Sequence, residues 1–169
     1  MYPKRFTKLQ LRTKPPQYII IHSTNCRCPF PSLRQDTKDF KTDSVIACNV
    51  ELDQEQDCIF HYMIDKIHDD YYVIVGRPEY YKYAGFNFKN SAFEESLHIC
   101  VIGDYNQVKA PTRLYEVLAY RLVARLLYQN NIPVSNILLH SEIDTSVSCP
   151  GSFFDKILLI NILKRFRVR

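Results

Sequence analysis

Two histidines and one cysteine are the residues of this chain best suited to chemistry. His22 comes directly after an apolar run at residues 18–21, and His140 comes directly after a second run at residues 137–139. Cys149 follows His140 by nine residues and precedes a Pro-Gly turn. Two imidazoles and a thiolate can bind a zinc ion and leave its fourth position open, as catalysis requires. Such an ion polarises a carbonyl and lowers the pKa of its bound water to about 7.

The composition is that of an ordinary globular domain. The chain has 169 residues, of which 46% are hydrophobic and 24% charged, so we expect one domain with a substantial core. The formal net charge of +4 is compatible with an anionic polymer such as a cell wall or a nucleic acid, but it indicates neither. We expect no nucleic acid among the partners.

The N-terminus does not have the pattern of a secretory signal peptide. It is basic, but it leads to Gln10, Arg12 and Lys14 rather than to an apolar stretch. No segment of the sequence is long and apolar enough to cross a membrane. We therefore expect a protein that is cytoplasmic as synthesised, whose action on a cell wall would need release or packaging.

The chain contains six cysteines, and a cytoplasmic setting favours reduced thiols over disulfides. Cys26 and Cys28 could join Cys48 and Cys58 in a second, structural zinc site, although the spacings match no usual zinc pattern. Cys58 and Cys100 lie in strand-like apolar runs, which favours small core residues at both positions. The sequence leaves the roles of these thiols open.

Short apolar runs alternate along the chain with stretches of helical periodicity. Strands are expected at residues 18–22, 58–65, 71–75, 97–102 and 137–139, with helices at residues 111–129 and 153–167 and a short one near residues 44–52. This order predicts an α/β fold, a central mixed β-sheet flanked by helices, in a single domain over residues 17–169. Residues 1–16 are basic, end in two prolines and are expected to form a flexible N-terminal arm.

Five motifs occur in an order that is typical of one enzyme family. They are residues 19–24 (IIIHST), 60–65 (FHYMID), 75–78 (VGRP), 96–105 (SLHICVIGDY), and 139–143 (LHSEI) followed by 149–151 (CPG). In this order they resemble the zinc-dependent N-acetylmuramoyl-L-alanine amidases, which include phage lysozyme-type amidases and the peptidoglycan recognition proteins. The resemblance extends over nearly the whole chain, from about residue 18 to residue 154.

The resemblance implies a function and a set of ligands. Zn²⁺ would be held by His22, His140 and Cys149, and the enzyme would hydrolyse the amide between N-acetylmuramic acid and L-alanine in peptidoglycan. The partner is then peptidoglycan or a muropeptide, in an endolysin-like or wall-remodelling role. Two alternatives stay open: a muropeptide-binding module with little or no catalysis, or an interaction protein that reuses the fold, to which only the basic arm points.

Several positions differ from the family's usual helpers. Active members place a tyrosine before the second-strand histidine, or a glutamate in the later strand, where this chain has Phe60 and Cys100. Val147 replaces a lysine or threonine before the cysteine ligand, and Tyr83 replaces a histidine before Ala-Gly. We expect Phe60, Tyr83 and Val147 to lie against the substrate. Tyr62 is two residues beyond Phe60, so strand alternation places both on one face and makes Tyr62 the candidate catalytic substitute.

Three further polar residues can be explained without a direct role in chemistry. His61 is expected to point away from the face that carries Phe60, as a packed or hydrogen-bonded histidine, and His98 is also expected to be structural. Glu142 follows His140 closely and could either orient that ligand or be a solvated charge.

Overall fold

The computed structural model describes residues 10–24, 59–83 and 90–165. Several predictions fall outside these ranges and stay predictions. They are the helix near residues 44–52, the second zinc site with Cys26, Cys28, Cys48 and Cys58, and the last residues of the predicted C-terminal helix.

The centre of the structure is a five-stranded mixed sheet in the order β3-β2-β4-β1-β5. Its strands are β1 (Ile19–Ser23), β2 (Tyr62–Ile67), β3 (Asp70–Val75), β4 (Leu97–Val101) and β5 (Ile137–Leu139). β1 runs parallel to both β4 and β5, and β2 runs parallel to β4. Only the β2–β3 pair is antiparallel. The predicted central mixed sheet is confirmed, and β2 begins later and ends later than the sequence indicated.

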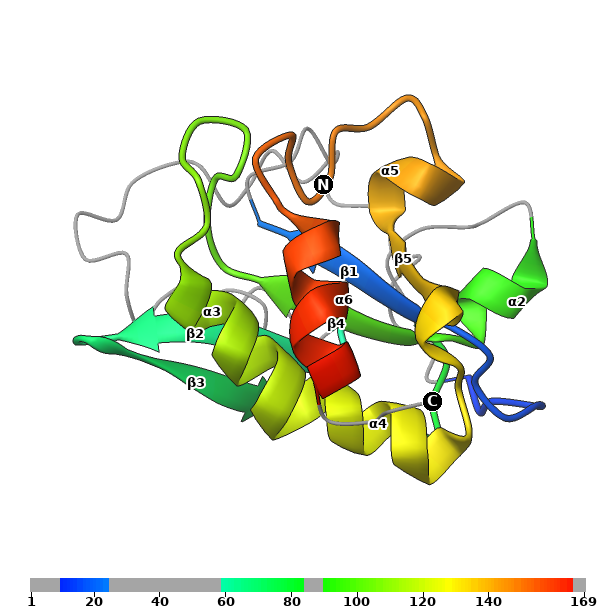
Figure 1. The fold of residues 1–169 in the computed structure, drawn as a ribbon. Coiled ribbons are helices and arrows are strands. Elements are labelled where there is room, and N and C mark those ends of the chain that lie inside the picture. The colour runs from blue at the N-terminus through cyan, green and yellow to red at the C-terminus, as the bar shows by residue number, and fades with distance from the viewer. Residues whose placement is uncertain (1–9, 25–58, 84–89, 166–169) are drawn as a thin grey trace, which may run out of the picture.

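A long helical rod and the C-terminal helix cover one face of this sheet (Figure 1). The rod consists of α3 (Thr112–Val117), a π-helical turn η3 (Leu118–Val123) and α4 (Ala124–Asn130), where one regular helix was predicted. The C-terminal helix is α6 (Lys156–Arg165). Three short elements were not predicted, namely α2 (Ser91–Glu94), the 3-10 turn η4 (Val134–Asn136) and α5 (His140–Ile143). In the described part of the chain, no helix has the length and apolar character needed to span a bilayer.

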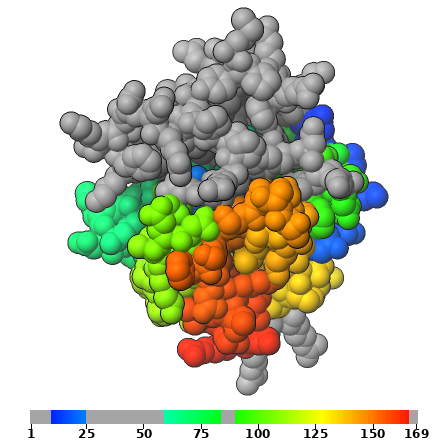
Figure 2. All heavy atoms as spheres, turned by 90° about the horizontal axis from the view of Figure 1, so that it is seen from above, coloured from blue at the N-terminus to red at the C-terminus, as the bar shows by residue number. Residues whose placement is uncertain are grey.

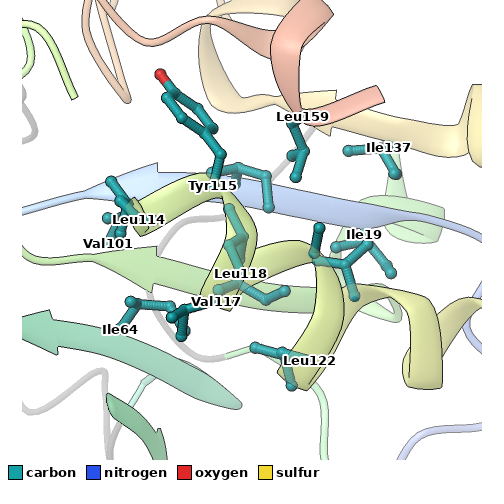
Figure 3. Close-up of a cluster of buried hydrophobic side chains, with 14 of the residues drawn as sticks. Ile19, Ile64, Val101, Leu114, Tyr115, Val117, Leu118, Leu122, Ile137 and Leu159 are labelled. Atoms are coloured by element: carbon teal, nitrogen blue, oxygen red, sulfur yellow. The ribbon is translucent and has the colours of Figure 1, made fainter. Parts of the chain in front are cut away.

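The two faces of the sheet differ in chemistry. Ile19 and Ile64 point toward the rod and pack with Leu118 and Leu122 in the main hydrophobic core (Figure 3). The alternate residues of the same strands point the other way, since successive strand side chains face opposite sides. That second face carries a smaller buried cluster of Phe60, Met63, Tyr83 and Cys100, and it also carries His22.

The N-terminal segment is bound to the domain from Gln10 onward. The backbone N–H of Arg12 donates to the Tyr80 carbonyl at 2.8 Å, and Lys82 N–H donates to the Gln10 carbonyl at 2.7 Å. Leu11 forms an isolated antiparallel bridge with Tyr81. The prediction of a flexible arm over residues 1–16 is therefore wrong for residues 10–14, because residues 10–12 add a strand-like pairing to residues 80–82 and the next two residues bond to Glu95. Residues 1–9 lie outside the described ranges.

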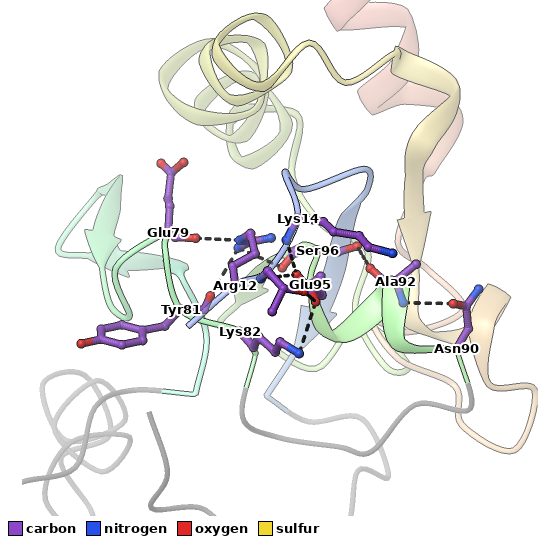
Figure 4. Close-up of polar contacts among 10 residues, drawn as sticks. Arg12, Lys14, Glu79, Tyr81, Lys82, Asn90, Ala92, Glu95 and Ser96 are labelled. Atoms are coloured by element: carbon purple, nitrogen blue, oxygen red, sulfur yellow. Dashed lines mark hydrogen bonds and ion pairs between the residues drawn. The ribbon is translucent and has the colours of Figure 1, made fainter. Parts of the chain in front are cut away.

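A single buried carboxylate fastens this segment. Glu95 accepts hydrogen bonds from the backbone N–H of Thr13 at 2.8 Å and of Lys14 at 2.9 Å, and from the Thr13 hydroxyl (Figure 4). Lys82 adds an ion pair at 3.2 Å. Burial alone would raise the pKa of Glu95, but these hydrogen bonds and the lysine outweigh it and lower that pKa to about 2.

We predict that Glu95→Gln lowers the free energy of unfolding by about 2 kcal/mol at pH 7, because charge-assisted hydrogen bonds become neutral ones. The Glu95 pKa is lowered in the folded state, so its contribution is complete above pH 4.5 and is lost as the pH falls toward 2. Denaturant unfolding at several pH values should therefore show the gap between wild type and variant closing in that window. The matched control is Glu94→Gln, which should stay within about 0.5 kcal/mol of wild type; an equal loss in both variants would contradict the role of Glu95.

Candidate metal centre

The three predicted ligands meet at one edge of the sheet. His22 is near the end of β1, and His140 begins α5 directly after β5, whose last residue pairs with Ile21. Because β1 and β5 are parallel, their carboxyl ends lie at the same edge and bring the two imidazoles together. The ligand atoms of His22, His140 and Cys149 all lie within 4.8 Å of one another, and all three residues are buried.

Backbone contacts fix the turn that carries Cys149. The N–H of Ser23 donates to Cys149 Sγ at 3.3 Å, and Ser141 N–H donates to the Cys149 carbonyl at 2.8 Å. Gly151 has φ +128°, and a Cβ there would come within 2.3 Å of the Tyr105 carbonyl carbon, so only glycine allows this approach. Figure 2 shows the segments around residues 105 and 150 side by side on the upper surface.

The His22 ring is held between the thiol and a second histidine. Its Nδ1 lies 3.9 Å from Cys149 Sγ, and its Nε2 lies 2.8 Å from His98 Nδ1. His98 Nε2 in turn lies 2.6 Å from the carbonyl oxygen of Phe93 in α2. Nδ1 is therefore the His22 nitrogen that faces the other candidate ligand.

Burial keeps all three candidate ligand groups uncharged. It lowers the pKa of His22 well below 6.5, with a further contribution from nearby His140. It also lowers the pKa of His140, against an opposing effect of Asp144. For Cys149, burial raises the pKa of the thiol to about 12, against hydrogen bonds from Ser23. Near pH 7 the site thus offers two neutral imidazoles and one thiol.

This donor set fits a tetrahedral divalent cation. In such a zinc site, with bonds of about 2.0 Å to nitrogen and 2.3 Å to sulfur, ligand atoms lie roughly 3.5 Å apart. The observed 3.9 Å between His22 Nδ1 and Cys149 Sγ is close to that value. Two nitrogens and one sulfur are ligands that zinc prefers, and they leave one of four positions open.

Most of the sequence also fits one family. Residues 12–152 match the family described as N-acetylmuramoyl-L-alanine amidase. The chain belongs to this amidase family. The resemblance that the five ordered motifs indicated is therefore confirmed. No curated protein sequence matches the chain.

Solved structures of amidases and peptidoglycan recognition proteins share the fold of this family member. N-acetylmuramoyl-L-alanine amidase LysC from Clostridium intestinale URNW is 18% identical, with a TM-score of 0.62, over 100% of this chain and 96% of that chain. The endolysin of Thermus scotoductus bacteriophage Ph2119 is 20% identical, with a TM-score of 0.59, over 92% of this chain and 89% of that chain. A mutant of Drosophila PGRP-LB in complex with tracheal cytotoxin is 22% identical, with a TM-score of 0.59, over 88% of this chain and 82% of that chain.

Two of the predicted substrate-contacting residues of this amidase-family chain lie beside His22. The ring centroid of Phe60 is 5.2 Å from that of His22, and the ring centroid of Tyr83 is 5.5 Å away in a stacked arrangement. Val147 lies half-buried in the turn before Cys149, where its N–H donates to the Asp144 carbonyl at 3.3 Å.

Tyr62 does not join them. It packs in the core on the helix side of the sheet, while Phe60 belongs to the cluster on the other side. Strand alternation failed as a guide because Phe60 precedes β2: the consecutive carbonyls of Phe60 and His61 accept from Arg77 and Gly76, whereas a regular antiparallel ladder bonds alternate residues. The Tyr62 hydroxyl donates to Glu79 and accepts from Arg125 at 3.2 Å.

The remaining polar residues are satisfied in specific ways. His61 Nδ1 accepts from the His98 backbone N–H at 3.0 Å, and its Nε2 donates to the Tyr81 carbonyl at 2.9 Å, as expected of a structural histidine. Glu142 accepts from the Leu139 N–H at 2.6 Å and pairs with a lysine, so it caps the helix that begins with His140. No motif or spacing in the sequence indicated the contact between His98 and His22.

We predict that the chain binds one zinc ion and that His22→Ala and Cys149→Ala each abolish this binding. Because the Cys149 thiol is protonated near pH 7 and the imidazoles are neutral, uptake should release about one proton, and the affinity should rise about tenfold per pH unit. Calorimetry in buffers of different ionisation enthalpy measures this proton count. Cys100→Ala, also buried on this face, is the control that should keep its zinc; stoichiometric binding to Cys149→Ala would refute the ligand set.

We also predict that Tyr62→Phe leaves catalytic turnover unchanged and costs about 1 kcal/mol of stability, because it removes only the hydrogen bonds to Glu79 and Arg125. Parallel assays of peptidoglycan hydrolysis and thermal unfolding check both parts. Tyr72→Phe, on the neighbouring strand and 46% exposed, serves as the reference. A tenfold fall in turnover of Tyr62→Phe at full zinc occupancy would show that Tyr62 takes part in catalysis after all.

Proposed function

We propose that this chain is a zinc-dependent N-acetylmuramoyl-L-alanine amidase that cleaves the amide between the lactyl group of N-acetylmuramic acid and L-alanine. The observation that carries the proposal is the convergence of His22, His140 and Cys149 within 4.8 Å in a chain that belongs to this family. The fold shared with amidases and an endolysin supports it. A lytic role fits the same activity.

In this proposal the three ligands hold the cation and leave it electron-deficient. A zinc ion bound there would supply Lewis acidity for the scissile carbonyl and for a water nucleophile. Two neutral imidazoles and one thiolate leave a net charge of +1 at the site, so the ligand set does not neutralise the cation. Burial of His22, His140 and Cys149 keeps bulk water from competing for the ligand positions.

The aromatic pair Phe60 and Tyr83, which is only 7% and 5% exposed, would form the apolar base of the substrate site beside His22. Phe60 and Tyr83 lie with their ring centroids 5.6 Å apart, and both face the His22 ring. Aromatic faces suit the apolar faces of sugars and small aliphatic side chains. The muramoyl ring and the first alanine of the stem peptide are substrate groups of that kind.

A second candidate function is muropeptide binding with little or no turnover. It is favoured by the apolar character of the positions where helpers are usual, because Phe60 and Val147 supply no proton and Cys100 is fully buried. Loss of a general acid or base costs roughly two to four orders of magnitude in rate. The PGRP-LB mutant complex contains tracheal cytotoxin, which supports a muropeptide as the ligand in either case.

The deciding experiment measures stem peptides released from purified sacculi, with and without a zinc chelator. We predict release that the chelator stops and added zinc restores, with no release by Cys149→Ala and normal release by Cys100→Ala. Pelleting the same sacculi measures binding in parallel. Binding at full zinc occupancy without peptide release would establish the binding function instead, and absence of both would reject the two proposals.

A further inference from the structure

We propose that His98 is a positioning residue for the metal site, which holds His22 in the tautomer that presents its Nδ1 lone pair to the cation. The inference rests on the proposed metal site. His98 is not one of the three ligands, and the family resemblance gives it no role. Its place in β4 puts it near the centre of the sheet, where β4 pairs with β1.

The contact between the two rings is a head-on hydrogen bond. The facing nitrogens, His22 Nε2 and His98 Nδ1, are 2.8 Å apart, while the ring centroids are 5.1 Å apart at an interplanar angle of 24°. The difference between these two distances equals the sum of the two ring radii. Both nitrogens therefore lie on the line that joins the ring centres. Stacking looks different: Tyr83 lies over His98 with centroids 3.8 Å apart and an angle of 6°.

The surroundings of His98 decide which atom donates. Its Nε2 faces the Phe93 carbonyl oxygen at 2.6 Å, and a carbonyl only accepts, so Nε2 carries a hydrogen. A neutral imidazole has one N–H, and this ring is fully buried, where a charged form is disfavoured. His98 Nδ1 is therefore an acceptor, and His22 Nε2–H donates to it.

The same logic reaches the metal position. With its proton on Nε2, neutral His22 keeps a lone pair on Nδ1, the atom that faces Cys149 Sγ. The opposite tautomer would oppose two lone pairs at 2.8 Å and leave both nitrogens unsatisfied in a buried site, which is costly. His98 thus makes one proton arrangement strongly preferred, and that arrangement is the one that metal binding needs.

The carbonyl at the end of this chain of contacts is also well anchored. Phe93 lies in α2, whose N-terminus is capped by Asn90 through a 3.0 Å hydrogen bond to Ala92 N–H. Glu95, which ends α2, holds the N-terminal segment. The His98 backbone N–H is fixed separately by His61 Nδ1 at 3.0 Å. The backbone of His98 and the carbonyl oxygen that its ring faces are therefore both held in place.

The test compares His98→Leu, which removes the acceptor, with His98→Asn, whose amide oxygen can still accept near the Nδ1 position. We expect His98→Leu to weaken zinc binding roughly 10- to 100-fold, His98→Asn to recover much of the loss, and the control Cys100→Ala to bind like wild type. Affinity is measured by competition with a chromophoric chelator. Equal affinities for His98→Leu and Cys100→Ala would overturn the proposal.

A second measurement reads the tautomer directly and does not depend on zinc. In the zinc-free full chain labelled with ¹⁵N-histidine, we expect His22 to show a protonated Nε2 and an unprotonated Nδ1, and His98→Leu to shift the proton toward Nδ1. A protonated Nδ1 in wild type, or a tautomer unchanged in His98→Leu, rejects the role of His98. The wild-type spectrum decides even if His98→Leu does not fold, and absence of zinc binding by wild type would reject the metal site alone.

Discussion

The parallel pairing of β1 between β4 and β5 is the constraint on which the rest of the structure depends. It buries all five residues of β1, so an imidazole at its end cannot rely on water. The pairing of β1 with β5 also sets His140 next to His22, because β5 ends one residue before His140. The late turn at Cys149 then closes the site through the Ser23 N–H. Each ligand thus comes from a different element, and one strand holds the three together.

The sheet separates an apolar face from a polar one. Under the helical rod, Ile19, Leu118 and their neighbours form an apolar core in which burial is favourable by itself. On the other face His22 and His98 are buried, and their rings bond to each other and to the Phe93 carbonyl rather than to a carboxylate. Their polar atoms are satisfied by one another and by carbonyl oxygens, which avoids the cost of burying an unpaired donor. This network stiffens the face on which the cation would bind.

The sequence predicted what short apolar runs and local motifs encode, and failed where contacts join distant segments. The strand before His22 and the fold class follow from patterns a few residues long. The face of the sheet on which Tyr62 lies depends on the irregular hydrogen bonding at Phe60, which strand alternation in the sequence cannot reveal. His98 lies in the predicted strand, but its partner is set by the pairing of β4 with β1. Glu95 holds Thr13 from 82 residues away, so no local pattern could show that residues 10–14 are docked.

The residues around His22 separate the binding of a cation from the transfer of a proton. Phe60 is buried next to His22, and an apolar side chain at that place strengthens the electrostatic interactions of a bound cation. The Phe60 side chain supplies no group that can take a proton from water or give one to a leaving amine. Ligand burial therefore favours tight metal binding in an enzyme and in a binding module alike. In an enzyme with this site, the rate of hydrolysis would depend on the group that moves the proton, and the ligand set would determine how tightly the ion is held.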